Sequence, residues 1–229
     1  MRNVRSRRGF TLVELLLAMT FLSVLMIAIT ISTMQIINQY SKGVTIKSIN
    51  LAGRDVADMF RRDALASADA LRYVTPQAGD GLGRLCFGTT SYVWNTADRL
   101  QNQTGHRYQN DTRAGDPRGD MIVLARVKDA GAQYCTPSAS GQYDTNIPMS
   151  KATELLGSRE GDLALRDLQV DRVVDNSDGA QALYRLRFTI GTNERDTINT
   201  ADQTCKPPND DATNYNFCAI NIFETLIQG

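Results

Sequence analysis

The sequence has few of the residues that carry enzyme chemistry. It contains a single histidine, His106, and it has no G-x-S-x-G, H-E-x-x-H or Walker phosphate-loop motif. The glycines of residues 79–83 resemble a phosphate cradle, but no strand is expected before them and Pro76 lies close by, which favours a flexible turn. We therefore expect His106 at the surface, no catalytic residues and no cofactor, and we expect that the chain is not an enzyme.

Cysteine is also scarce. The four cysteines, Cys86, Cys135, Cys205 and Cys218, are widely spaced, and none of them forms a C-x-x-C pair. An even number with this spacing favours disulfides in an oxidising compartment over zinc or a redox centre. Three pairings are possible for four cysteines.

Neither sign of charge is in excess over the whole chain. Basic and acidic residues each number 25, but Arg2, Arg5, Arg7 and Arg8 all precede residue 10, so residues 10–229 carry 21 basic and 25 acidic side chains. A mildly acidic body does not favour nucleic acid or an anionic membrane surface as the main partner.

A single-strand DNA interface would combine aromatic and basic side chains. The candidates for it are Tyr92, Trp94, Tyr108, Arg107, Arg113 and Arg118. The alternative interpretation is a core aromatic group beside a solvated charged loop, and the acidic balance favours this alternative.

One long hydrophobic run is present, at residues 10–37. Glu14 is its only charged residue, and no further charge follows until Lys42. The run can cross a bilayer as a helix, and because it continues into a helical pattern instead of ending at a small-residue cleavage site, we expect it to be retained. By the positive-inside rule the arginines stay in the cytoplasm and the chain after about Tyr40 lies outside.

Glu14 is unusual because an ionised carboxylate in hydrocarbon costs about 2.5 to 3.5 kcal/mol even on the lenient insertion scale. One interpretation places Glu14 close enough to the cytoplasmic interface to remain hydrated. The other supposes that the chain is cut after Gly9. Phe10 then has a free α-amine, which the Glu14 of a neighbouring subunit could neutralise.

The run Arg8-Gly9-Phe10-Thr11-Leu12-Val13-Glu14 resembles the prepilin leader and cleavage site of type IV pilins and type II secretion pseudopilins. The resemblance covers about the first 30 residues. It implies that a prepilin peptidase cuts between Gly9 and Phe10 and methylates Phe10, and that Glu14 guides assembly with other pilins or pseudopilins through the N-terminal helix. It implies residence in the cytoplasmic membrane, and then in a cell-surface pilus or a periplasmic pseudopilus.

The resemblance also bears on the disulfides. We favour Cys205 with Cys218 and Cys86 with Cys135, since the first pair would close a loop like the disulfide-bounded C-terminal loop of many pilins. Closing so short a loop stabilises by about 3 kcal/mol in the chain-entropy account. That loop contains Asp210 and Asp211, a weak calcium candidate, although their spacing departs from the EF-hand pattern and favours a solvated loop.

Apolar side chains recur every three to four residues from residue 43 to about residue 72, which predicts an amphipathic helix continuing the span, with Gly43 and Gly53 permitting bends. Strands are expected at residues 92–94, 121–127, 168–174, 182–190 and 219–227. The domain prediction is a leader at 1–9, a transmembrane helix at 10–37, its amphipathic continuation at 38–72 and a β-rich extracytoplasmic head at 73–229. The fold class is α+β and pilin-like, a long helix packed on an antiparallel sheet with two disulfides.

The function that these features favour is a minor type IV pilin or a minor pseudopilin, because the head is large and loop-rich. The helix with Arg61-Arg62-Asp63 resembles that of large minor pilins and J-type pseudopilins. Such a subunit would prime, tip or extend a filament for adhesion, motility, DNA uptake or protein secretion. The alternatives are a filament-tip binding module, either an adhesin or a DNA receptor, and a membrane-anchored hydrolase.

Overall fold

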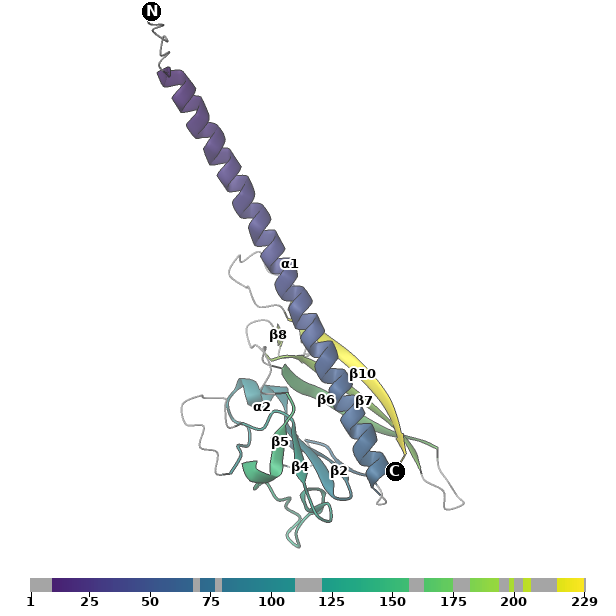
Figure 1. Ribbon diagram of the computed structural model, residues 1–229. Coiled ribbons are helices and arrows are strands. Elements are labelled where there is room, and N and C mark those ends of the chain that lie inside the picture. The colour runs from purple at the N-terminus through teal and green to yellow at the C-terminus, as the bar shows by residue number, and fades with distance from the viewer. Residues whose placement is uncertain are drawn as a thin grey trace, which may run out of the picture. The chain divides into compact units, whose positions relative to one another are not determined.

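The computed structural model describes residues 10–67, 71–76, 80–109, 121–156, 163–174, 182–193, 198–199, 204–206 and 218–228. The chain divides into two units, with the boundary after Gly43. Figure 1 shows the N-terminal helix and the β-rich region that follows it. The fold class is α+β and pilin-like, as the sequence predicts.

The N-terminal element is the helix α1, Leu12–Ala66, of 55 residues. It is the one helix in the described ranges that is long and apolar enough to cross a membrane. The sequence predicted that the helix would continue to about Arg72, but it ends at Ala66 and Arg72 begins the strand β1. The reason is long-range: Arg72 pairs with Cys86 across an antiparallel ladder, and this pairing outweighs the local helical periodicity.

Five antiparallel strands form the first sheet, in the order β1-β2-β3-β4-β5. Their bounds are β1 Arg72–Val74, β2 Leu82–Phe87, β3 Thr90–Asn95, β4 Ala125–Lys128 and β5 Ala152–Glu154. The short helix α2, Ala97–Gln101, follows β3, and the 3-10 turns η1, Gln133–Cys135, and η2, Met149–Lys151, lie between β4 and β5.

The second sheet has the order β10-β7-β6 and is also antiparallel. Its strands are β6 Leu163–Val174, β7 Leu183–Thr192 and β10 Ile220–Gln228, and a small ladder joins β8 Ile198–Asn199 to β9 Thr204–Cys205. Along β7 the alternation holds as predicted: Leu186 and Phe188 are buried while Arg185 and Arg187 are exposed. Each strand expected from the sequence overlaps an observed one, and β1, β2, β5, β8 and β9 are additional.

One face of α1 supplies the core of the head. Its buried side chains recur every three or four residues and contact both sheets; they are Ile49, Ala52, Val56, Phe60 and Ala64. The ring of Phe60 meets Tyr92 edge-on with centroids 4.6 Å apart and Phe188 edge-on at 5.5 Å. Such aromatic contacts add to the free energy of burial, so Phe60 links the helix to a strand of each sheet.

Two glycines have roles that the sequence did not reveal. We expected Gly53 to permit a bend, but α1 continues through it, and a β-carbon there would lie 2.1 Å from Cζ of Phe223. Gly53 therefore allows β10 to approach the helix closely. We expected Gly83 in a flexible turn without a preceding strand, but β1 precedes it, and Gly83 lies within β2 opposite Trp94, whose ring occupies the space of a β-carbon.

Both disulfides pair as the sequence analysis favoured. Cys86 of β2 bonds to Cys135 of η1 with their Cα atoms 6.2 Å apart, and Cys205 of β9 bonds to Cys218 with Cα atoms 5.5 Å apart. The first bond ties η1 to the strand that pairs with β1. The second closes the loop that contains Asp210 and Asp211, which lie outside the described residues.

Candidate functional site

The start of α1 is closed by a reciprocal pair of side chains, Thr11 and Glu14. The Thr11 amide and hydroxyl both donate to Oε2 of Glu14, at 3.0 Å and 2.9 Å, and the Glu14 amide donates back to the Thr11 hydroxyl at 3.3 Å. This is a capping box, in which an N-cap threonine and a glutamate three residues later satisfy amides that have no partner within the helix. The sequence pattern Thr-x-x-Glu carries this signal, and our sequence interpretation missed the role of Thr11.

The capping box satisfies hydrogen bonds of Glu14 but does not neutralise its charge. Both donors from Thr11 reach the same oxygen, and no lysine or arginine of the described ranges forms an ion pair with Glu14. In a low-dielectric environment a carboxylate needs a countercharge in addition to hydrogen bonds. Among the described residues, the Glu14 carboxylate is therefore bonded only to Thr11.

The hydroxyl groups along the apolar half of α1 bond to the helix itself. Each donates at 2.8 to 2.9 Å to a carbonyl three or four residues earlier; they belong to Thr20, Ser23, Thr30, Ser32 and Thr33. Because hydrocarbon offers no hydrogen bonds, a spanning helix must satisfy its polar groups internally. These side chains meet that requirement, so they do not oppose entry into a membrane.

Exposed apolar side chains occur around the whole circumference of this half of α1. The exposed fraction is 68% for Phe21, 61% for Ile27 and 66% for Ile36. A continuous apolar surface of this kind requires an apolar environment, either lipid or other helices. Together with the length of the helix, it fits membrane anchoring.

Phe10 is the first residue after the predicted cleavage junction. It precedes the helix and is 82% exposed. Gly9 and the leader residues Arg2, Arg5, Arg7 and Arg8 lie outside the described residues. The structure thus places Phe10, Thr11 and Glu14 together at the first turn, where a free α-amine on Phe10 would adjoin the positive end of the helix dipole.

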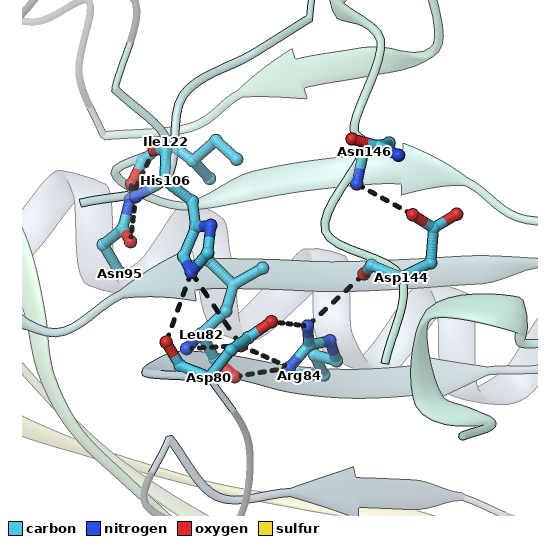
Figure 2. A network of polar contacts seen from close by, with 8 residues as sticks. All are labelled: Asp80, Leu82, Arg84, Asn95, His106, Ile122, Asp144 and Asn146. Atoms are coloured by element: carbon cyan, nitrogen blue, oxygen red, sulfur yellow. Dashed lines mark hydrogen bonds and ion pairs between the residues drawn. The ribbon is translucent and has the colours of Figure 1, made fainter. Parts of the chain in front are cut away.

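The head contains a polar network around the buried Arg84 (Figure 2). The Arg84 guanidinium donates to Asp80 at 3.0 Å and 3.2 Å and to the carbonyls of Leu82 and Asp144. Nε2 of His106 lies 3.2 Å from the Asp80 carbonyl. His106, expected at the surface, is only 25% exposed at its side chain.

Opposing effects set the pKa of Asp80. Burial acts to raise this pKa, but hydrogen bonds and charge from Arg84, with help from the Leu82 amide and His106, outweigh burial and hold it below its usual range. The ionised carboxylate therefore fixes Arg84 beside the Tyr143 ring, which lies 5.0 Å from the guanidinium carbon. The network joins β2 to the loop segments around His106 and Asp144.

A second ionic group anchors the end of α1 to the first sheet. Asp63 accepts two hydrogen bonds from Arg126 of β4, both at 2.7 Å, and one from the Tyr92 hydroxyl. Burial, followed by the contact with Asp63, raises the pKa of Tyr92. Arg61 donates to Thr225 of β10 at 2.7 Å, so two members of the Arg61-Arg62-Asp63 run hold the helix to the head.

The aromatic residues of the DNA-binding interpretation belong to the core. Tyr92, Trp94 and Tyr108 are 0%, 2% and 5% exposed, which agrees with the alternative of a core aromatic group. Arg113 and Arg118 lie outside the described residues. These three side chains therefore do not form an exposed aromatic platform in the described part of the head.

Comparison with known proteins matches the N-terminal segment of the chain. The family described as prokaryotic N-terminal methylation motif matches residues 4–30. No curated protein and no solved structure matches the chain. The matched residues contain the Gly9–Phe10 junction, the Thr11–Glu14 capping box and the first part of the apolar helix. The chain therefore carries a prepilin segment of the kind found in type IV pilins and pseudopilins, joined to an α+β, pilin-like fold.

Proposed function

We propose that this chain is a minor type IV pilin or pseudopilin. In this proposal a prepilin peptidase cuts between Gly9 and Phe10 and methylates the new amine, and the subunit then leaves the membrane to enter a filament. The role is structural, and no catalytic step is assigned to the head. The proposal rests on the prepilin segment together with the helix that follows it.

The observation that carries the proposal is the continuity of α1 from Leu12 to Ala66. The first half of this helix presents apolar side chains outward, while the residues from Ile49 to Ala64 build the core of the head. A removable signal peptide would need no such continuity. A helix that both anchors and folds into the head suits a subunit that is held in a membrane and then packed into a filament.

Glu14 has a second function in this proposal. Its carboxylate accepts hydrogen bonds from Thr11 but has no countercharge among the described residues, and the cut leaves a positive amine on Phe10 of the next subunit. Pairing the two would remove a cost of about 2.5 to 3.5 kcal/mol for an isolated charge in hydrocarbon. Insertion of a new subunit would thus be favoured where its neighbour presents the free amine.

The minor role is supported by the head. Its described part has a five-stranded, a three-stranded and a two-stranded sheet, together with two disulfides. A large, loop-rich head suits a subunit present in few copies, at the tip or the start of a filament. Arg61 and Asp63, which prompted the comparison with J-type pseudopilins, are used within the head to bind Thr225 and Arg126.

Processing is tested by expressing the full chain with and without a prepilin peptidase and measuring intact mass and the N-terminal sequence. We expect the loss of residues 1–9 and an N-methylated Phe10 only when the peptidase is present. A Gly9→Leu variant is the matched control, since a bulky residue before the cut should block processing. An uncut wild-type chain would contradict the proposal.

Assembly is tested with two substitutions at Glu14. Glu14→Ala removes both the cap and the charge, whereas Glu14→Gln keeps an oxygen that can accept the Thr11 hydrogen bonds. We expect both variants to be cut normally and both to enter filaments poorly in sheared-filament fractions. Normal incorporation of the glutamine variant would show that Glu14 acts only as a helix cap.

A further inference from the structure

The strand β10 forms one edge of the second sheet and pairs with β7 only. Its other edge carries the backbone amide and carbonyl groups of a nine-residue strand, Ile220–Gln228, without a partner strand in the described ranges. Free edges invite pairing with a strand of another chain, and proteins usually protect them with bulges, charges, proline or short length.

The other edges in the described part of the two larger sheets are protected. β1 and β5 have three residues each. β6 is long, but its register shifts at two places, it exposes Asp167 and Asp171, and Tyr73 of β1 donates to its Leu168 carbonyl. Each of these features hinders the addition of a further strand.

β10 lacks these protections, although the Ile222 amide already donates to the Asn221 side chain at 2.9 Å. Its register with β7 runs without a shift from Ile220 to Gln228, and the strand contains no proline and no lysine. Glu224 is its one charged residue, and it is paired with Arg185 of β7 at 3.2 Å. Ile222 and Leu226, on either side of Glu224 on the outer face, are 52% and 49% exposed.

The inner face of β10 is fixed against α1. Asn221 bonds to Asn50 at 2.7 Å, Phe223 packs over Gly53, and Thr225 accepts from Arg61. At about 100° per residue, Arg54 and Leu65 are the next positions around the helix beyond Arg61, on the side away from the core. Arg54 and Leu65 are both exposed, so a cationic and an apolar side chain of the helix follow β10 on this side.

From these observations we propose that β10 is a docking edge for an extended strand of a different protein, which adds to the sheet beside β10. The partner strand carries apolar side chains at two positions four residues apart, opposite Ile222 and Leu226, and a basic side chain between them, opposite Glu224. Backbone hydrogen bonds supply affinity in this mode of recognition, and alternate side chains supply specificity.

A second copy of this chain is a poorer occupant. Antiparallel pairing of two β10 strands that sets Ile222 opposite Leu226 also sets Glu224 opposite Glu224, and parallel pairing in register does the same. Like charges placed directly opposite each other destabilise a strand pair. A different strand with a basic residue at that position avoids this repulsion.

The test uses a fluorescent peptide, Thr-Val-Thr-Lys-Thr-Val-Thr, titrated with the full chain in detergent micelles and followed by anisotropy. Two versions carry N-methyl groups on the amides of one edge or of the other, which prevents the peptide from pairing with itself. A third version is methylated on both edges. We expect one of the first two to bind with Kd below about 1 mM and the third not to bind.

Ile222→Lys and Leu226→Lys should each weaken binding by about 10-fold or more, because a lysine protects the edge. The matched control is Val173→Lys, which places lysine at an exposed valine of β6 and should leave binding unchanged. Circular dichroism would verify that all variants are folded.

Three results would overturn the proposal: no binding up to about 1 mM, equal binding of the doubly methylated peptide, or equal weakening by Val173→Lys. The choice of partner has a separate test. If the full chain self-associates in sedimentation, and Glu224→Gln strengthens this association while Ile222→Lys abolishes it, the occupant is a second copy and the proposed partner is wrong.

Discussion

The two halves of α1 have the same helical geometry but opposite surfaces. From Leu12 to Gly43 the large apolar side chains are exposed, whereas from Val44 onward one face of the helix is buried in the head and the other carries charges such as Arg54 and Asp58. Helix formation is local and is the same in both halves. The surroundings differ, and they determine which substitutions destabilise the protein.

The largest contrast is expected between Phe60 and Phe21. Phe60→Ala removes a fully buried ring that contacts Tyr92 and Phe188 and should lower the free energy of unfolding of the head by about 3 to 5 kcal/mol. Phe21→Ala, at an exposed position of the first half, should leave that free energy unchanged. Denaturant unfolding followed by the fluorescence of Trp94, the single tryptophan, measures both. Equal effects would contradict the separation into two surfaces.

The two helical glycines give the next contrast. A methyl group on Gly53 would enter the Phe223 ring, so Gly53→Ala should destabilise the head by about 1 to 3 kcal/mol. No atom lies within 4 Å of the position of a β-carbon on Gly43. Gly43→Ala should therefore stabilise the helix by up to about 1 kcal/mol through its higher helix propensity. Thermal unfolding separates the two, and stabilisation by Gly53→Ala would show that the helix can move away from β10.

The capping box should have a smaller and more local effect. Thr11→Ala removes the N-cap and should destabilise the first turn by about 0.5 to 2 kcal/mol, whereas Thr11→Ser retains the hydroxyl and should change little. Hydrogen exchange of the amides of residues 11–15 in micelles measures this effect. Unfolding of the head should be unaffected, and a change there would mean that the first turn influences the core.

The smallest expected effect is the pH dependence contributed by Asp80. Because its pKa is lowered in the folded state, the ionised carboxylate stabilises the head above the unfolded pKa of about 3.9, and this contribution is lost as pH falls through the lower folded value. Asp80→Asn should therefore make unfolding less sensitive to pH in the acid range. Asp98→Asn, at an exposed residue of α2, is the control. An unchanged acid dependence in Asp80→Asn would show that Asp80 does not contribute to it.

Much of the N-terminal segment could be predicted from the sequence because its interactions join residues close together in the chain. The apolar run, the single carboxylate and the Gly9–Phe10 junction are contiguous. The capping box of Thr11 and Glu14 was also readable, since it joins residues three apart, and it was missed only because Glu14 was considered as a charge rather than as a cap.

The head was predictable only in part. Alternation identified β7, and the favoured disulfide pairing is the observed one. The predicted end of α1 was wrong, and the strands β1 and β2 were missed. Arg72 and Gly83 take their conformation from strand partners that lie elsewhere in the sequence. Local propensity contains no information about such partners.

The sequence by itself therefore determined a prepilin segment, a long helix able to span a membrane and an α+β head, since these depend on composition and on short-range spacing. Only the tertiary structure decided how the head is held together: Phe60 between two sheets, Asp63 on Arg126, and Gly53 beneath Phe223. It also decided that β10 lies at the edge of its sheet among the described strands. Whether a strand is central or at an edge depends on long-range pairing, which no local pattern encodes.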